Sequence, residues 1–201
     1  MVKEEIVQRI YNLVGKSPYV RKREFEKGAI IANYISNHHY VYFLMNGEAN
    51  LVRRHYGGDN QLVSKFERYD CFGDIFHDVT INNEMVVIAT KRCSVLYFDY
   101  DDVVKEYPEL ARYVFEMTVE NIKNMNEHIS VLNQKTTRDK LLMYFRSLSR
   151  QRMSRSFSIP FSYTELASYL NVDRSAMMRE ISFLEEDGII NKEKHFIILN
   201  S

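Results

Sequence analysis

The chain is poor in cysteine, since Cys71 and Cys93 are its only two among 201 residues. Two cysteines are too few for a disulfide scaffold or for a four-cysteine zinc or iron–sulfur site. No run of about eighteen apolar residues occurs, and the amino terminus lacks the apolar stretch of a signal peptide. Internal repeats and low-complexity stretches are not evident either. We therefore expect a soluble, cytoplasmic protein with two reduced thiols.

Net charge is also lacking, because 27 Lys and Arg balance 27 Asp and Glu. The balance differs along the chain. From Asn133 onward eleven Lys and Arg stand against eight Asp and Glu, which gives +3, and the remaining sixteen against nineteen give −3 for residues 1–132. A modestly basic carboxyl part on an acidic amino part suits a sensor joined to a nucleic-acid-binding domain. With 45% apolar residues, the chain can form one large or two smaller cores.

The last forty residues predict two short helices around a tight turn, followed by a hairpin. Ser162 and Glu165 have the spacing of a capping box, so the first helix starts there. Asn171 ends it, because Asn tolerates the left-handed conformation that a sharp turn needs. Asp173 is placed to cap the second helix, and Gly188 ends that helix before two apolar runs that flank a charged tip. This order predicts a winged helix-turn-helix, a device that enters the major groove of DNA.

The second helix of this pair has an apolar stripe and an opposite polar face. An Arg side chain can fork onto guanine O6 and N7, whereas Ser pairs with almost any base. The candidate DNA-binding residues of both helices and the hairpin are Ser162, Thr164, Arg174, Ser175, Met178, Arg179, Lys192 and Lys194. The basic loop at residues 149–156 is a further candidate for phosphate contact, or is simply solvated. The alternative for the whole region is a helical hairpin packed into a core, with its arginines only solvated.

Short β-rich runs cut by glycine turns extend from about residue 20 to residue 98. The turns fall at Gly28, Gly47, Gly57-Gly58 and Gly73. Strands at this spacing indicate a jelly roll or a small barrel. An amino-terminal helix over residues 1 to about 20 precedes this region, with Ile6 on its apolar face.

A long helix is predicted from about residue 100 to residue 133, and Pro108 opens its main segment. It carries two adjacent apolar stripes, so two of its surfaces need to be buried. A second copy of the same helix is the simplest partner for one of them, and complete burial in a single chain is the alternative. The candidate dimer-interface residues are Val114, Thr118, Asn121, Met125 and Leu132. The polar segment 133–137 is expected to be a hinge.

A β-roll with glycine corners, a long dimer helix and a winged helix together resemble the CRP/FNR family of bacterial transcription regulators. The matching pieces are residues 25–30, 47–51, 72–75, 89–95 and 162–190, and their order carries the likeness. The resemblance implies an α+β fold with an amino-terminal double-stranded β-helix (jelly roll) at residues 1–107. It further implies a dimerisation helix at 108–134 and a winged-helix DNA-binding domain at 135–201. A homodimer that binds a two-fold site on double-stranded DNA and contacts RNA polymerase is then expected, with no enzymatic activity.

The effector segment departs from the family pattern. In family members that bind cyclic nucleotides, an Arg neutralises the cyclic phosphate and a small polar residue follows it. By the resemblance these positions fall on Asn83 and Glu84, where a carboxylate would repel the phosphate. The candidate effector pocket consists of Asp74, Ile75, Asn83, Glu84 and Val86. We therefore expect a small-molecule effector other than cyclic AMP, or none, and no cofactor.

Two other classes of protein remain as alternatives. His38 and His39 could suggest a cupin-like metalloprotein, but adjacent residues on a strand point to opposite faces, so they cannot share a metal. Within the CRP/FNR resemblance, His77 is a candidate haem ligand, because it lies near the expected pocket and six residues after Cys71. A role as an ordinary surface or hydrogen-bonded loop histidine is favoured. The second alternative is a ligand-binding β-roll whose helical carboxyl domain docks a protein partner rather than DNA.

Overall fold

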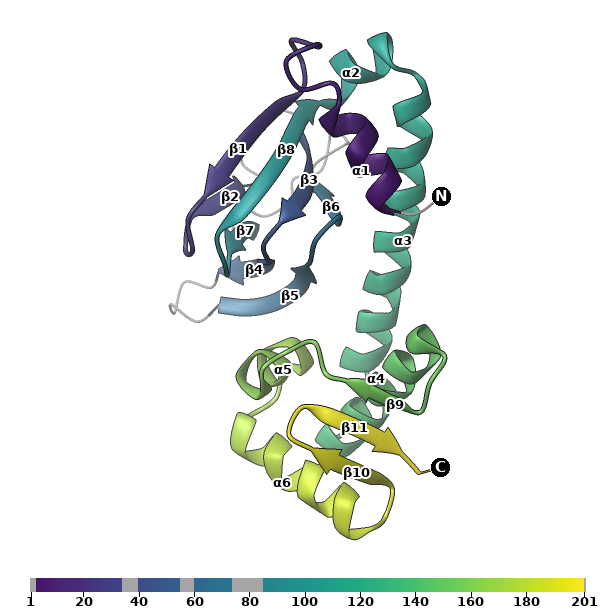
Figure 1. Ribbon diagram of the computed structural model, residues 1–201. Helices are drawn as coiled ribbons and strands as arrows, with labels where there is room; N and C mark the ends of the chain where they lie inside the picture. Colours follow the sequence, from purple (N-terminus) through teal and green to yellow (C-terminus); the bar gives the residue numbers. More distant parts are fainter. Residues whose placement is uncertain (1–2, 34–39, 55–59, 74–84, 201) are drawn as a thin grey trace. The chain divides into compact units, whose positions relative to one another are not determined.

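The computed structural model describes residues 3–33, 40–54, 60–73 and 85–200 (Figure 1). The chain divides into two compact units between Glu120 and Asn121, inside the helix α3 (Glu109–Leu132). The first half of α3 therefore belongs to the amino-terminal unit, and the second half belongs to the carboxyl-terminal unit. The sequence predicts a helical stretch from about residue 100 to residue 133, with Pro108 opening its main segment. The structure divides it at Tyr107 and Pro108 into α2 (Tyr100–Glu106) and α3.

Two four-stranded antiparallel sheets form the amino-terminal unit and confirm the predicted jelly roll. The first sheet has the order β1 (Arg21–Phe25), β8 (Cys93–Asp99), β3 (Tyr40–Asn46) and β6 (Cys71–Gly73). The second has the order β2 (Ile30–Asn33), β7 (Met85–Ala89), β4 (Ala49–Arg54) and β5 (Asn60–Phe66). Apart from the consecutive pair β4 and β5, hydrogen-bonded neighbours are distant in sequence, as expected of a chain that crosses between two sheets.

Each face of the first sheet has its own apolar core. Side chains alternate between the two faces of a strand, so Leu44 of β3 faces the second sheet, and Phe43 faces the helices. The helical face packs against α1 (Lys3–Tyr11), α2 and the first half of α3, and Figure 1 shows α1 beside α3. Arg9 Nη1 donates to Tyr113 Oη at 3.2 Å and joins these two helices.

The carboxyl-terminal unit is a small helical domain with a three-stranded sheet. Its helices are α4 (Thr137–Arg152), α5 (Tyr163–Leu170) and α6 (Arg174–Glu186), which join the second half of α3. The sheet has the order β10 (Ile190–Glu193), β11 (Phe196–Leu199) and β9 (Ser156–Ser158). Strand β9 was not predicted, because only Phe157 is apolar in its three residues, and its pairing with β11 depends on a distant segment.

Candidate nucleic-acid interface

Side-chain caps hold the two helices of the helix-turn-helix in place. Ser162 Oγ accepts from the Glu165 backbone N–H at 3.2 Å, and Glu165 Oε2 accepts from the Ser162 N–H at 2.9 Å. Asn171 has φ 50°, in the left-handed region, and ends α5. Asp173 Oδ1 accepts from the Ala176 N–H at 2.8 Å and begins α6. The predicted capping box, Asn turn and second cap are confirmed.

Burial divides α6 into two faces. Its apolar stripe, Met177, Ile181 and Leu184, is fully buried in the core of the unit. Of the residues predicted to contact DNA, six are exposed: Ser162, Thr164, Arg174, Ser175, Arg179 and Lys194. The other two, Met178 and Lys192, are half-buried. The structure thus brings one polar surface together from the start of α5, the outer face of α6 and the tip of the hairpin.

Charge changes sign along α6. Arg174 and Arg179 stand in its first half, and neither forms an ion pair with another residue in the described ranges. Acidic residues gather at the other end, where Asp187 is ion-paired with Arg138 of α4. The amino-terminal half of a recognition helix is the part that contacts base edges. Arg174 and Arg179 therefore lie where a helix in the major groove would contact guanine and phosphate.

Lys192 is engaged inside its own domain. Its Nζ lies 3.6 Å from Glu185 Oε2, and its backbone N–H donates to Glu185 Oε1 at 3.3 Å. The side chain of Lys192 is only 22% exposed. Glu185 therefore engages Lys192, whereas Lys194 lies exposed at the hairpin tip with φ 55°.

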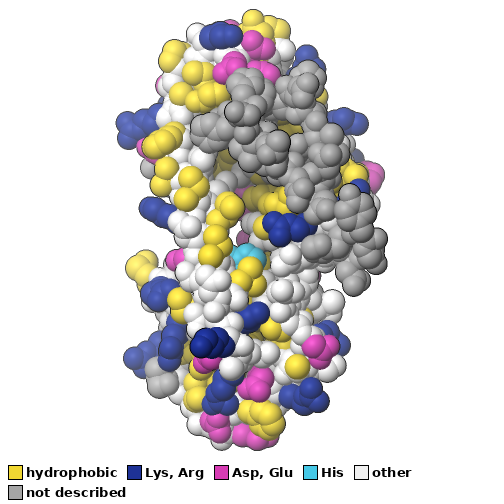
Figure 2. All heavy atoms as spheres, turned by 180° about the vertical axis from the view of Figure 1, so that it is seen from behind, with side chains coloured by type: hydrophobic (Ala, Val, Ile, Leu, Met, Phe, Trp, Pro, Cys, Tyr) yellow, Lys and Arg dark blue, Asp and Glu magenta, His cyan; other side chains and the backbone are white. Residues whose placement is uncertain are grey.

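Tyr163 and His195, which no sequence pattern singles out, hold the hairpin tip. The Tyr163 hydroxyl of α5 donates to the Lys194 carbonyl, and the Tyr163 ring stacks on His195 with centroids 4.8 Å apart. These contacts connect the start of α5 to the hairpin of β10 and β11, which is the wing of the winged helix. Sequence offered no signal for them, because the two segments are about thirty residues apart and neither side chain belongs to an apolar pattern. Figure 2 shows Lys and Arg side chains spread over the carboxyl-terminal unit on the face drawn there.

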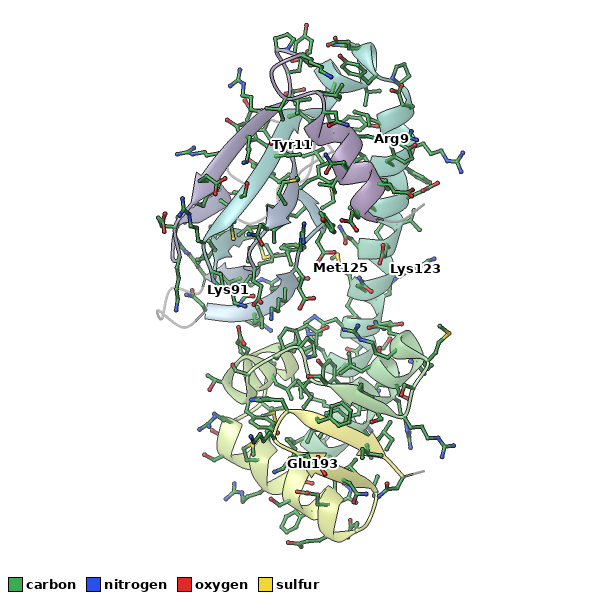
Figure 3. The ribbon with its side chains drawn as sticks, viewed as in Figure 1. Arg9, Tyr11, Lys91, Lys123, Met125 and Glu193 are labelled. Atoms are coloured by element: carbon green, nitrogen blue, oxygen red, sulfur yellow. The ribbon has the colours of Figure 1, made fainter. Side chains whose placement is uncertain are left out.

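Helix α3 exposes a row of large apolar side chains. The exposed fractions are 68% for Phe115, 51% for Ile122, 58% for Met125 and 52% for Ile129. With the half-buried Thr118 and Leu132 they form a run at positions 115, 118, 122, 125, 129 and 132. This is the alternating three- and four-residue spacing of a coiled-coil seam. We call these six residues the α3 seam. Figure 3 shows Met125 and Lys123 leaving α3 in different directions.

The α3 seam shares only part of the stripe predicted from sequence. Val114, which the prediction included, is 1% exposed and packs in the core of the amino-terminal unit. Asn121 is half-buried. The prediction followed a neighbouring row of the helix, because sequence alone does not tell which of two adjacent apolar stripes its own domain covers. Thr118, Met125 and Leu132 belong to both sets.

Four of the five predicted effector-pocket residues, Asp74, Ile75, Asn83 and Glu84, lie outside the described residues. The same holds for His38, His39 and His77. Val86 is described, and it is 3% exposed on β7. On the described strands of the first sheet, the Tyr42 ring stacks on the rings of Phe72 and Tyr97. Burial raises the pKa of Tyr42 to about 12. Among the residues that the structure covers, no group of three or more His, Cys, Asp or Glu could hold a metal ion.

Both cysteines are buried, and neither is in a disulfide. Cys71 lies in the core beneath the helices, and Cys93 lies between the sheets. Cys93 Sγ is 3.2 Å from the carbonyls of Glu48 and Lys91, and burial raises the pKa of this thiol. Within the described ranges no helix is long and apolar enough to span a bilayer.

Two β-sheets followed by a winged helix-turn-helix define the general class of protein, a β-roll domain joined to a helix-turn-helix domain. A family model described as a cyclic nucleotide-binding domain matches residues 22–107. A second, described as a Crp-like helix-turn-helix domain, matches residues 139–201. The chain belongs to the CRP/FNR family of transcription regulators, which the sequence had indicated.

Curated relatives are distant in sequence and extend over most of the chain. Transcriptional activator protein FnrL of Cereibacter sphaeroides is 22% identical over 175 residues, which cover 79% of this chain and 68% of that protein. The cyclic AMP receptor protein of Thermus thermophilus is 20% identical over 179 residues, which cover 86% of this chain and 80% of that protein. The first is named as a transcriptional activator and the second as a cyclic AMP receptor.

Solved structures share the fold at low sequence identity. A cyclic nucleotide-binding domain containing protein from Listeria monocytogenes EGD-e superposes with a TM-score of 0.76 at 14% identity, covering 96% of this chain and 97% of that one. CprK complexed with OCPA superposes with a TM-score of 0.74 at 16% identity, covering 94% of this chain and 91% of that one. At such identities the likeness shows a common architecture of β-roll, long helix and winged helix.

Proposed function

We propose that this protein is a homodimeric transcription regulator that binds a specific two-fold site on double-stranded DNA through α6. One observation carries the proposal. The outer face of α6 is polar and exposed, its first half holds Arg174 and Arg179, and neither arginine is engaged by a described acidic residue. A fold that buries one face of a capped helix and leaves such a face outside is suited to the major groove.

Base reading in this proposal depends on Arg174, Ser175 and Arg179. Each arginine can donate two parallel hydrogen bonds to a guanine edge, and Ser175 can donate to or accept from several bases. Exposed groups at the start of α5 and at Lys194 of the wing are suited to phosphates, which position the domain without reading sequence. A two-fold dimer presents two such helices to one side of the duplex. Half-sites should therefore be centred roughly one helical turn apart, about 34 Å.

The dimer in this proposal forms through the α3 seam. Four large apolar side chains that are each at least half exposed lie in one row, and a second copy of the helix would cover them. The proposal further includes contact with RNA polymerase, as the family resemblance implies, and no enzymatic activity. Any effector is a small molecule other than cyclic AMP, since a carboxylate at Glu84 is unsuited to a cyclic phosphate.

The proposal is tested by unbiased selection of DNA fragments with the purified protein, followed by binding assays at several salt concentrations. We expect a two-fold sequence to be enriched. Its affinity should fall steeply with salt, because each phosphate contact releases counterions. If no sequence is enriched above the starting pool, or if the affinity for DNA does not depend on salt concentration, DNA binding is contradicted. Docking of a protein partner by the carboxyl domain is then favoured. Metal content measured on the same sample tests the cupin-like alternative, for which a stoichiometric metal ion is required.

A further inference from the structure

The carbonyl groups at the end of α5 are satisfied by side chains from two other helices. Tyr169, Leu170 and Asn171 are the last residues before the turn that leads to α6. His128 Nε2 of α3 lies 2.7 Å from the Tyr169 carbonyl oxygen. Lys140 Nζ of α4 donates to the Leu170 carbonyl at 3.0 Å and to the Asn171 carbonyl at 3.4 Å. The final carbonyls of a helix have no partner within it, so these two residues supply donors that the turn itself lacks.

His128 is fixed in two independent ways. Its ring stacks on the Tyr169 ring, with centroids 3.7 Å apart and planes 6° from parallel. A carbonyl oxygen only accepts, so the Nε2 that faces it carries the hydrogen and donates. The stack sets the plane of the imidazole, and the hydrogen bond sets its rotation. His128 is 8% exposed, so water competes weakly for this contact.

The same segment of α3 carries part of the α3 seam. His128 lies between Met125 and Ile129, which are 58% and 52% exposed. Side chains one residue apart on a helix differ in direction by about 100°. Within a few residues, α3 therefore presents one face to a second copy of the chain and another face to the end of α5. The polar segment after Leu132 connects α3 to α4 covalently. His128 adds a non-covalent contact from α3 to the turn before α6.

We propose that His128 and Lys140 are positioning residues that set the separation of the two recognition helices in the dimer, and thereby the half-site spacing that the dimer accepts. The inference rests on the proposed dimeric DNA binding and deepens it. His128 fixes the α5–α6 turn against the helix that pairs the two copies, and Lys140 fixes the same turn against α4. Neither residue needs to touch DNA. Without them each winged helix keeps its own fold, and its placement relative to α3 becomes less defined.

The test uses the full chain and three substitutions. His128→Phe keeps a stacking ring and removes the donor, and His128→Gln keeps an N–H donor without the ring. Lys140→Met removes the two bonds from α4, with Lys135→Met as its control, since Lys135 is exposed in the segment between α3 and α4. Affinity is measured on duplexes whose two selected half-sites are moved apart or together in single base-pair steps. Thermal unfolding and mass in solution are measured for every protein.

We expect the parent and Lys135→Met to prefer one spacing sharply. Losing a hydrogen bond should reduce that preference by about five- to tenfold in His128→Phe and Lys140→Met. His128→Gln should recover part of it, and binding to a single half-site should not change. A spacing profile that is unchanged in both His128→Phe and Lys140→Met overturns the proposal, even if both variants are less stable, because it would show a structural role only.

A measurement without DNA separates failure of this inference from failure of the proposed function. Spin labels on Ser182→Cys, at an exposed position of α6, report the distance between the two recognition helices, and both natural cysteines are buried. The parent should give one narrow distance distribution, and His128→Phe and Lys140→Met should broaden it. Equal widths in parent and variants contradict the positioning role. Broadening together with a parent that selects no DNA would contradict the DNA-binding function and the spacing role, while leaving His128 as a determinant of domain placement.

Discussion

Substitution of Met125 by Glu should separate the dimer. Met125 is 58% exposed in the single chain, and full burial of such a side chain contributes about 1.5–3 kcal/mol. Covering the exposed half therefore stabilises the dimer by about 1 kcal/mol per copy, or about 2 kcal/mol for two copies. A carboxylate at this position also costs several kcal/mol when it is buried without a partner. Together these effects exceed about 4 kcal/mol, which raises the dissociation constant about a thousandfold.

The assay is mass in solution by light scattering or sedimentation across a range of protein concentrations. Asn124→Glu is the matched control, because it adds the same charge one residue away at an exposed position outside the α3 seam. We expect Asn124→Glu to remain a dimer and Met125→Glu to become a monomer with its fold intact. If Met125→Glu keeps the mass of the parent at low concentration, the α3 seam is not the dimer interface.

Three further predictions concern cyclic AMP binding, the close approach at Gly73 and the ionisation of Tyr169. Titration calorimetry should detect very weak binding of cyclic AMP or none, and micromolar affinity would refute the argument from the Glu84 carboxylate. Gly73→Ala should lower the unfolding temperature clearly, because φ is 136° and an added Cβ would lie 2.2 Å from the Tyr40 carbonyl oxygen; an unchanged melting curve would contradict this. Burial raises the pKa of Tyr169 from 10.0 to about 12, so its stabilising effect is complete below pH 10 and is lost as pH rises toward 12. Urea unfolding at pH 8 and pH 11 should therefore differ less in Tyr169→Phe than in the parent, and equal differences would show that this tyrosine is not responsible.

The helix-turn-helix was predictable from sequence because its determinants are local. Ser162 caps a helix that starts one residue later, and Asn171 and Asp173 act within a few residues of themselves. Short polar side chains at these positions have few other roles, so their order along the chain identified both helices and the turn. The buried row on α6 followed from its spacing of four and then three residues.

Contacts between distant segments could not be read from the sequence. Strand β1 begins with four exposed residues that are all charged, and it is a strand because β8 pairs with it about seventy residues later. Its spacing along the predicted long helix places His128 in the same stripe as Val114 and Met125, and only the folded chain brings it against Tyr169. Lys192 and Lys194 look alike in sequence, but Glu185 lies beside the first of them alone. Tertiary pairing decides these cases, and no local pattern records it.

Recognition of DNA by α6 through Arg174 and Arg179 can be measured as the affinity of Arg174→Ala and Arg179→Ala for the selected site and its single-base variants. Each substitution should cost about 1–3 kcal/mol and should relax base choice at one position in each half-site. Arg112→Ala, which removes the same charge from an exposed position of α3, should bind like the parent. If Arg174→Ala and Arg179→Ala both bind the selected site as tightly as the parent does, with the same base preferences, α6 is not the recognition helix.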